Sequence, residues 1–167
     1  ANPLPPIATA PPAAGVALDG SSALEIGSTP PPETTSEDAA AVDAAMVVLI
    51  LLVQLIIYPS FRAIGNDVFS SWHHRYVTAI GFIVIPLMFV QAGCIAVQLL
   101  EAVDWGNILS AAAMLGAWVA TFALSVPCHR KLQQEGKDPE IINRLILTNW
   151  LRTGCWIAVL AAGFIGG

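Results

Sequence analysis

The stretch Ala39–Tyr58 reads AAAVDAAMVVLILLVQLIIY, an apolar run that only Asp43 and Gln54 interrupt before its final tyrosine. At 1.5 Å of rise per residue, a helix of this length extends roughly 30 Å, which is the thickness of the hydrocarbon core of a bilayer. The preceding residues, Ser36–Asp38, offer an N-cap hydroxyl and two acids for the first helical turn. The stretch therefore predicts a membrane-spanning helix.

Three more apolar stretches follow it, at residues 76–100, 107–126 and 141–165. The first of these contains Pro86, which membrane helices tolerate where neighbouring groups satisfy the freed carbonyl. Asn107 is a candidate N-cap for the next stretch, and Pro127 is the expected stop signal at its end. Together with the span at residues 39–58, the pattern predicts an all-α, four-transmembrane-helix bundle over residues 36–167.

The start of the fourth span carries a strong local signal. Asp138, Pro139 and Glu140 follow one another there. They match the preferences for an N-cap, for the first helical position and for an acid in the first turn. A helix is therefore expected to begin at Pro139.

The composition agrees with a membrane protein. Of the 167 residues, 56% are hydrophobic and 11% are charged, with a mean hydropathy of +0.69. Soluble domains carry about 25% charged residues. Because only seven residues are Lys or Arg, no basic patch is available to neutralise phosphates. The lipid bilayer is therefore an expected partner, and nucleic acid is not.

Residues 1–35 differ in composition from the rest of the chain. They hold eight of the twelve prolines, many Ala, Gly, Ser and Thr residues, and no Lys or Arg. Such a segment cannot build a core, and it is predicted to run as an extended, Pro-rich N-terminal arm. The small bundle offers little surface to hold this arm, so other membrane subunits of a larger complex are the expected partners.

The basic residues gather at one end of the predicted bundle. They flank the loop between the first and second spans and the loop between the third and fourth: Arg62, Arg75, Arg130, Lys131, Lys137, Arg144 and Arg152. The positive-inside rule places these loops on the cytoplasmic or stromal side. Both termini of this integral, multi-pass protein are then expected on the periplasmic or lumenal side.

His73 and His74 lie just before the second span and are candidates for binding a cofactor. Neighbouring helix positions point about 100° apart, so the two rarely share one metal ion. One of them could instead pair with His129, which lies at the same membrane face. Ligation of a metal, a haem or a pigment was weighed against hydrogen bonding to loop carbonyls and head groups. The latter is favoured, and no metal site is predicted.

Arg144, Thr148 and Arg152 are spaced i, i+4 and i+8, so they share one face of the fourth span. Asn149 adjoins that face. A charge deep in a membrane helix is costly unless it is paired or reaches the surface. The face is either a polar pocket or a set of arginines that extend to the lipid head groups, and the second alternative is favoured.

Two short motifs carry a family resemblance over roughly residues 45–160. Residues 126–132, VPCHRKL, and residues 149–153, NWLRT, together with Tyr58–Phe61, resemble uncharacterised small four-helix bacterial membrane proteins and the anthrone-oxygenase-like four-helix family. The resemblance implies that four positions carry over as site residues: Pro127, His129, Asn149 and Arg152.

Two hypotheses for function follow. The leading one is a non-catalytic accessory subunit of a photosynthetic reaction-centre or light-harvesting complex. Its arm would bind neighbouring subunits, with lipid, carotenoid or (bacterio)chlorophyll at the contacts. The alternative is a small membrane oxidoreductase acting on a quinone-like or polycyclic substrate in a pocket formed by His73, His74, His129, Asn149 and Arg152. Convergence of these side chains around a cavity would favour the enzyme.

Overall fold

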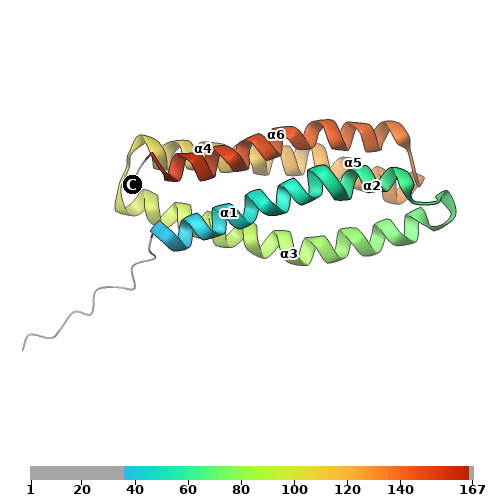
Figure 1. Cartoon of the computed structure of the whole chain (residues 1–167), viewed down its shortest axis with the longest axis horizontal. Coiled ribbons are helices and arrows are strands. Elements are labelled where there is room, and N and C mark those ends of the chain that lie inside the picture. The colour runs from blue at the N-terminus through green and yellow to red at the C-terminus, as the bar shows by residue number, and fades with distance from the viewer. Residues whose placement is uncertain (1–35, 166–167) are drawn as a thin grey trace, which may run out of the picture. The chain divides into compact units, whose positions relative to one another are not determined.

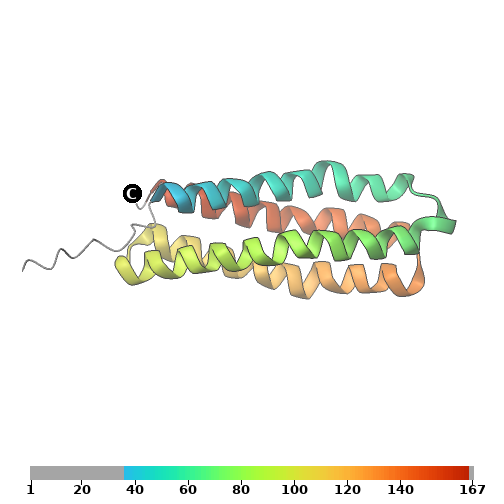
Figure 2. The same cartoon turned by 90° about the horizontal axis from the view of Figure 1, so that it is seen from below.

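The computed structural model describes residues 36–165, which form an antiparallel bundle of four long helical rods (Figures 1 and 2). All four rods are long and apolar enough to cross a membrane. The prediction of an all-α bundle with four transmembrane helices is therefore confirmed, and the chain is an integral multi-pass membrane protein. The predicted arm over residues 1–35 lies outside the described residues.

The rods are built from the following helical elements. The first contains α1 (Ser36–Leu52), the π-helical turn η1 (Val53–Ile57), α2 (Tyr58–Ser60) and the 3₁₀ turn η2 (Phe61–Ala63), and the second is α3 (Asn66–Glu101). The third contains α4 (Trp105–Ala120), the π-helical turn η3 (Thr121–Ser125) and α5 (Val126–Glu135), and the fourth is α6 (Pro139–Gly163). α6 packs against α1 and α4, and α3 packs against α1, α4 and α5.

Two of the predicted helix boundaries are wrong and one is confirmed. The helix does not stop at Pro127, because α5 continues through it to Glu135. The N-cap of α4 is Asp104 rather than Asn107. The Asp104 carboxylate accepts a hydrogen bond from the backbone N–H of Asn107 at 2.9 Å. Asp138 caps α6 as predicted, since its carboxylate accepts the backbone N–H groups of the two residues after Pro139.

The interior of the bundle has two apolar halves. Near the basic loops, Phe61, Phe69 and Leu145 are completely buried. In the other half, Met46, Trp156 and neighbouring side chains form a second cluster. The buried face of α6 runs through both clusters, and between them it carries polar side chains. The two apolar halves therefore enclose a polar layer.

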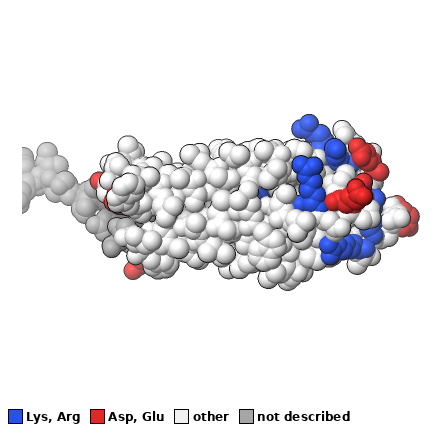
Figure 3. All heavy atoms as spheres, turned by 90° about the horizontal axis from the view of Figure 1, so that it is seen from above, with Lys and Arg blue, Asp and Glu red and all other residues white. Residues whose placement is uncertain are grey.

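The outer surface matches a bilayer environment. Large apolar side chains are exposed along all four rods, where lipid tails would cover them. Figure 3 shows a long uncharged belt, with the blue Lys and Arg side chains gathered at one end of the bundle. A few acidic side chains mark the opposite end. This distribution agrees with the multi-pass assignment.

Leu145→Ala is expected to destabilise the bundle by about 2 kcal/mol, the lower end for a buried Leu-to-Ala change, because lipid is as apolar as the core and only packing is lost. Leu145 is 0% exposed, whereas Leu147 on the same helix is 70% exposed. Leu147→Ala should therefore change stability by less than about 0.5 kcal/mol. Unfolding in mixed detergent micelles measures both changes, and equal effects would contradict this packing.

Candidate functional site

Arg152 lies in the polar layer between the two apolar halves. At 1.5 Å per residue it lies roughly 20 Å along α6 from Pro139. Its side chain is only 7% exposed, and its Nη1 atom donates to Asn149 Oδ1 at 3.0 Å and to Ser125 Oγ at 3.3 Å. The expectation that Arg152 extends to the lipid head groups is therefore wrong. Arg144, nearer the loop, is exposed.

Asn149 joins Arg152 to the first rod. Its Nδ2 atom donates to Gln54 Oε1 at 2.8 Å, and Gln54 Nε2 donates to the backbone carbonyl of Ile146 at 3.2 Å. Both side-chain amides are buried. They therefore provide hydrogen-bonding groups at a place that neither water nor lipid head groups reach. The guanidinium group is thus held by uncharged acceptors, and its charge is not neutralised by them.

Two prolines shape the backbone around this layer. Pro59 and Pro127 have no N–H group, and each ring would clash with the carbonyl four residues earlier. A π-helical turn precedes each proline: the N–H groups of Tyr58 and Val126 donate to carbonyls five residues back, in η1 and η3. One extra residue in a turn rotates the following side chains by about 100° around the helix. Gln54 and Ser125 themselves lie within these turns.

A chain of three side chains runs beside the arginine layer. His73 Nε2 and His129 Nδ1 are 3.0 Å apart, and His129 Nε2 lies 3.1 Å from the Tyr58 hydroxyl. The alternative in which His129 pairs with one of the two adjacent histidines is therefore the one observed, and the partner is His73. The favoured expectation of hydrogen bonds to loop carbonyls and head groups is wrong for His73. His73 is completely buried, whereas His74 is exposed. Helix geometry separates the two neighbours as expected.

A cavity of about 250 Å³ is lined both by Arg152 of the polar layer and by Tyr58 and His129 of the three-residue chain. Its polar lining comes from Tyr58, Tyr76, Thr121, Ser125, His129 and Arg152. Its apolar lining comes mostly from α3 and from the segment η3–α5, between which it lies, together with Val53 of η1. A mostly apolar pocket with a few converging polar groups is the usual form of a small-molecule site.

The residues predicted from the sequence take different places around this cavity. His129 and Arg152 line it. Asn149 and His73 stand behind them, each within hydrogen-bonding distance of one of the two. His74 is exposed, and its carbonyl accepts from Thr78. For His73 to ligate a pigment or haem through Nε2, its contact with His129 would have to break.

Tyr58, Gln54 and Ser125 belong to the site although the sequence did not single them out for it. Tyr58 was noticed only as part of a motif, and Gln54 only as an interruption of an apolar run. The available signal was position: each lies at or just before a proline inside a long apolar helix. A π-helical turn at such a position changes which side chains face inward.

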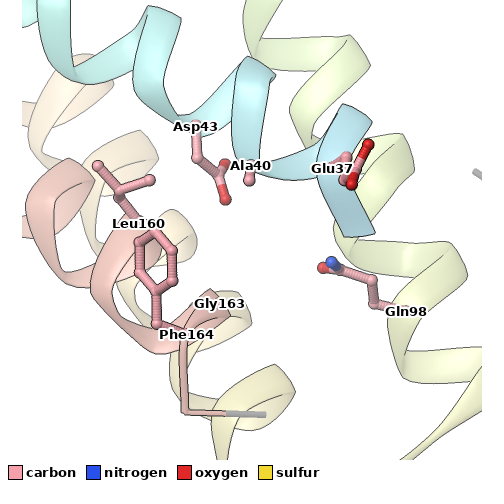
Figure 4. A pocket seen from close by; sticks show the side chains of 7 residues that line it. All are labelled: Glu37, Ala40, Asp43, Gln98, Leu160, Gly163 and Phe164. Atoms are coloured by element: carbon pink, nitrogen blue, oxygen red, sulfur yellow. The ribbon is translucent and has the colours of Figure 1, made fainter. Parts of the chain in front are cut away.

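A second hollow, of about 350 Å³, lies at the end of the bundle away from the basic loops. Figure 4 shows Glu37 and Asp43 of α1, Gln98 of α3, and Leu160 and Phe164 near the end of α6 around it. Among the described residues that line this hollow, Asp43 is the one carboxylate that is buried. Asp43 accepts a hydrogen bond from Gln91 Nε2. This hollow is therefore a weaker candidate than the cavity beside Arg152.

In the part of the chain that the structure describes, no three His, Cys, Asp or Glu side chains lie close enough together to hold a metal ion. Comparisons with protein-family models, with curated proteins and with solved structures found no match.

Asn149→Ala is expected to lower stability by about 2 kcal/mol or more, because it leaves Gln54 Oε1 without its donor and removes one of the two acceptors of the Arg152 guanidinium. Asn143 on the same helix is exposed and accepts from Arg62. Asn143→Ala should change stability by less than about 0.5 kcal/mol. Thermal unfolding in detergent distinguishes the two variants, and a neutral effect of Asn149→Ala would show that the network contributes nothing.

Proposed function

We propose that this protein is a small membrane oxidoreductase of the anthrone-oxygenase-like type, which acts on a lipid-soluble, quinone-like or polycyclic substrate. The observation that carries the proposal is that His129 and Arg152 line one cavity. A possible base and a permanent cation are thereby placed in a water-poor interior. This is the combination needed to form and stabilise a substrate anion.

The hydrogen-bonded chain supplies a route for the proton. The Tyr58 oxygen takes a proton from the substrate carbon while its own proton passes to His129 Nε2 across the 3.1 Å contact. The imidazolium that forms donates from Nδ1 to His73 Nε2, 3.0 Å away. This direction requires His73 Nε2 to be the acceptor. Tyr58 and His129 thus act together as one base.

Arg152 takes the complementary role. Removing a proton from an anthrone leaves a negative charge that is shared with its carbonyl oxygen. A guanidinium group whose acceptors within residues 36–165 are uncharged keeps its charge available for that oxygen. The resembled family implies dioxygen as the oxidant: one anthrone and one dioxygen give one anthraquinone and one water.

The position of the cavity suits a substrate that arrives through the bilayer. Ile85 and Phe122 line it from α3 and η3, and they are 57% and 61% exposed on the surface that lipid covers. An apolar molecule can therefore reach the cavity between α3 and the third rod without crossing the charged loops. The lining of such a pocket also favours flat apolar molecules over strongly hydrated ones.

His129→Ala should reduce the rate of oxidation by about 10²–10⁴-fold, as expected for loss of a general base. The assay uses anthrone with purified protein in nanodiscs and follows dioxygen uptake and anthraquinone absorbance. His74→Ala is the matched control, because His74 is exposed one residue away from His73. It should leave the rate unchanged. Equal rates for the wild type and His129→Ala would refute the proposed chemistry.

We also propose that the basic end of the bundle faces the cytoplasm or stroma and that both termini face the periplasm or lumen. Support comes from the positive-inside rule. All Lys and Arg side chains outside the polar layer lie toward one end of the bundle (Figure 3). The loop at the opposite end, between α3 and α4, carries Glu101 and Asp104. In this orientation His73 lies nearer the cytoplasmic face than Arg152 does.

Single cysteines test this orientation in spheroplasts that express the protein. Val103→Cys, on the loop between α3 and α4, should react with a membrane-impermeant maleimide before lysis. Gln134→Cys, at the exposed end of α5, should react only after lysis. The wild type, whose three cysteines all lie within the helices, gives the background. The reverse pattern of labelling would overturn the proposed orientation.

The accessory-subunit hypothesis stays a prediction. It depended on the composition of residues 1–35, which lie outside the described residues. A photosynthetic host and pigments at subunit contacts likewise remain expectations from the sequence.

A further inference from the structure

The cavity shares part of its lining with a void beside Trp156. This second, much smaller void of about 10 Å³ is lined by Arg152 and Trp156. Arg152, Val53 and Val84 line both this void and the larger cavity. Arg152 therefore borders both the apolar cavity and the void that Trp156 lines.

Two buried donors at this place have no acceptor. Arg152 Nε and Trp156 Nε1 are both enclosed without a hydrogen-bond partner within residues 36–165. An unsatisfied buried donor is costly, and native structures contain few of them. The two residues that carry these donors line the same void, and this points to an acceptor that is supplied from outside the chain.

The positive charge on Arg152 is a stronger reason to expect an acceptor from outside the chain. Its acceptors in the described part of the chain, Asn149 and Ser125, are uncharged. An isolated cation in a low-dielectric interior is far more costly than an unmatched amide. A single water fits a void of about 10 Å³, and it could accept from both donors. It would leave the positive charge uncompensated.

We infer that Arg152 and Trp156 form the head-group site for an oxyanion carried on an apolar body. The oxyanion accepts from Arg152 Nε and Trp156 Nε1, and the apolar body occupies the cavity of about 250 Å³ between α3 and η3–α5. The inference uses the same pocket as the proposed function but does not depend on oxidation. A long-chain carboxylate and the phenolate or enolate of an aromatic compound both have this chemistry.

Binding to the wild type tests the inference by calorimetry in phosphatidylcholine nanodiscs, with empty nanodiscs subtracted. Dodecanoate should bind about 30-fold or more tightly than dodecanol, the factor expected for a buried charge pair. A nitronaphtholate that is ionised at neutral pH should likewise bind more tightly than its methyl ether. If only dodecanoate binds more tightly than its neutral analogue, the site is assigned to fatty carboxylates. If only the naphtholate does so, the site is assigned to aromatic anions. Equal affinity for anion and neutral analogue in both pairs would overturn the inference.

Matched tryptophan variants test the second donor without removing the charge. Trp156→Phe should weaken anion binding by about 5-fold, the effect of one hydrogen bond. Trp118 Nε1 is also buried without a partner but lines neither void, so Trp118→Phe should leave affinity unchanged. Equal losses from both variants would contradict the assigned donor.

Arg152→Gln should abolish the preference for anions, so that dodecanoate binds no more tightly than dodecanol. Loss of dodecanol binding as well would show a structural role for Arg152 rather than a head-group site. Dodecanoate is not a substrate for the proposed oxidation, so its binding is measured independently of turnover. Anion preference combined with unchanged turnover in His129→Ala would retain this site and reject the proposed oxidation.

Discussion

A guanidinium group midway along a membrane helix has to be solvated by the protein, because lipid tails supply no hydrogen-bond acceptors. In this bundle Arg152 receives that solvation from Asn149 on its own helix and from Ser125 on the third rod. Asn149 is in turn held by Gln54 from the first rod. One charge thereby ties three of the four rods together at the level where the two apolar clusters separate.

Two prolines make this arrangement possible, and each is accompanied by one π-helical turn that interrupts the regular α-helix. Pro59 and Pro127 each lie just after a π-helical turn, and such turns often accompany functional sites. Because of these turns, the first and third rods direct Tyr58, Ser125 and His129 toward the same cavity. These three side chains are therefore positioned by the backbone as well as by side-chain contacts.

The sequence predicted the architecture better than it predicted the site. Apolar length alone defined four spans, and Asp138 with Pro139 predicted the start of α6, because these signals act locally. The place of Arg152 could not be predicted in the same way. Whether an arginine extends to the surface or turns inward depends on acceptors from other rods, and Gln54 and Ser125 lie far from it in the sequence. A pairing of His129 with His73 or His74 was one alternative that the shared membrane face suggested, whereas Tyr58 was missed because a π-helical turn shifts the helical periodicity.

The polar layer and the cavity beside it both depend on Arg152 pointing into the bundle and not to the lipid head groups. Solid-state NMR of arginine-labelled protein in phospholipid bilayers measures this directly, through dipolar coupling between guanidinium nitrogen and lipid phosphorus. Arg152 should show no phosphorus coupling and a close contact with the Asn149 side chain. Arg144, which is exposed on the same helix, should couple to phosphorus and serve as the internal standard, with Arg152→Lys identifying the signal. Coupling of Arg152 to phosphorus at the strength seen for Arg144 would contradict the buried site.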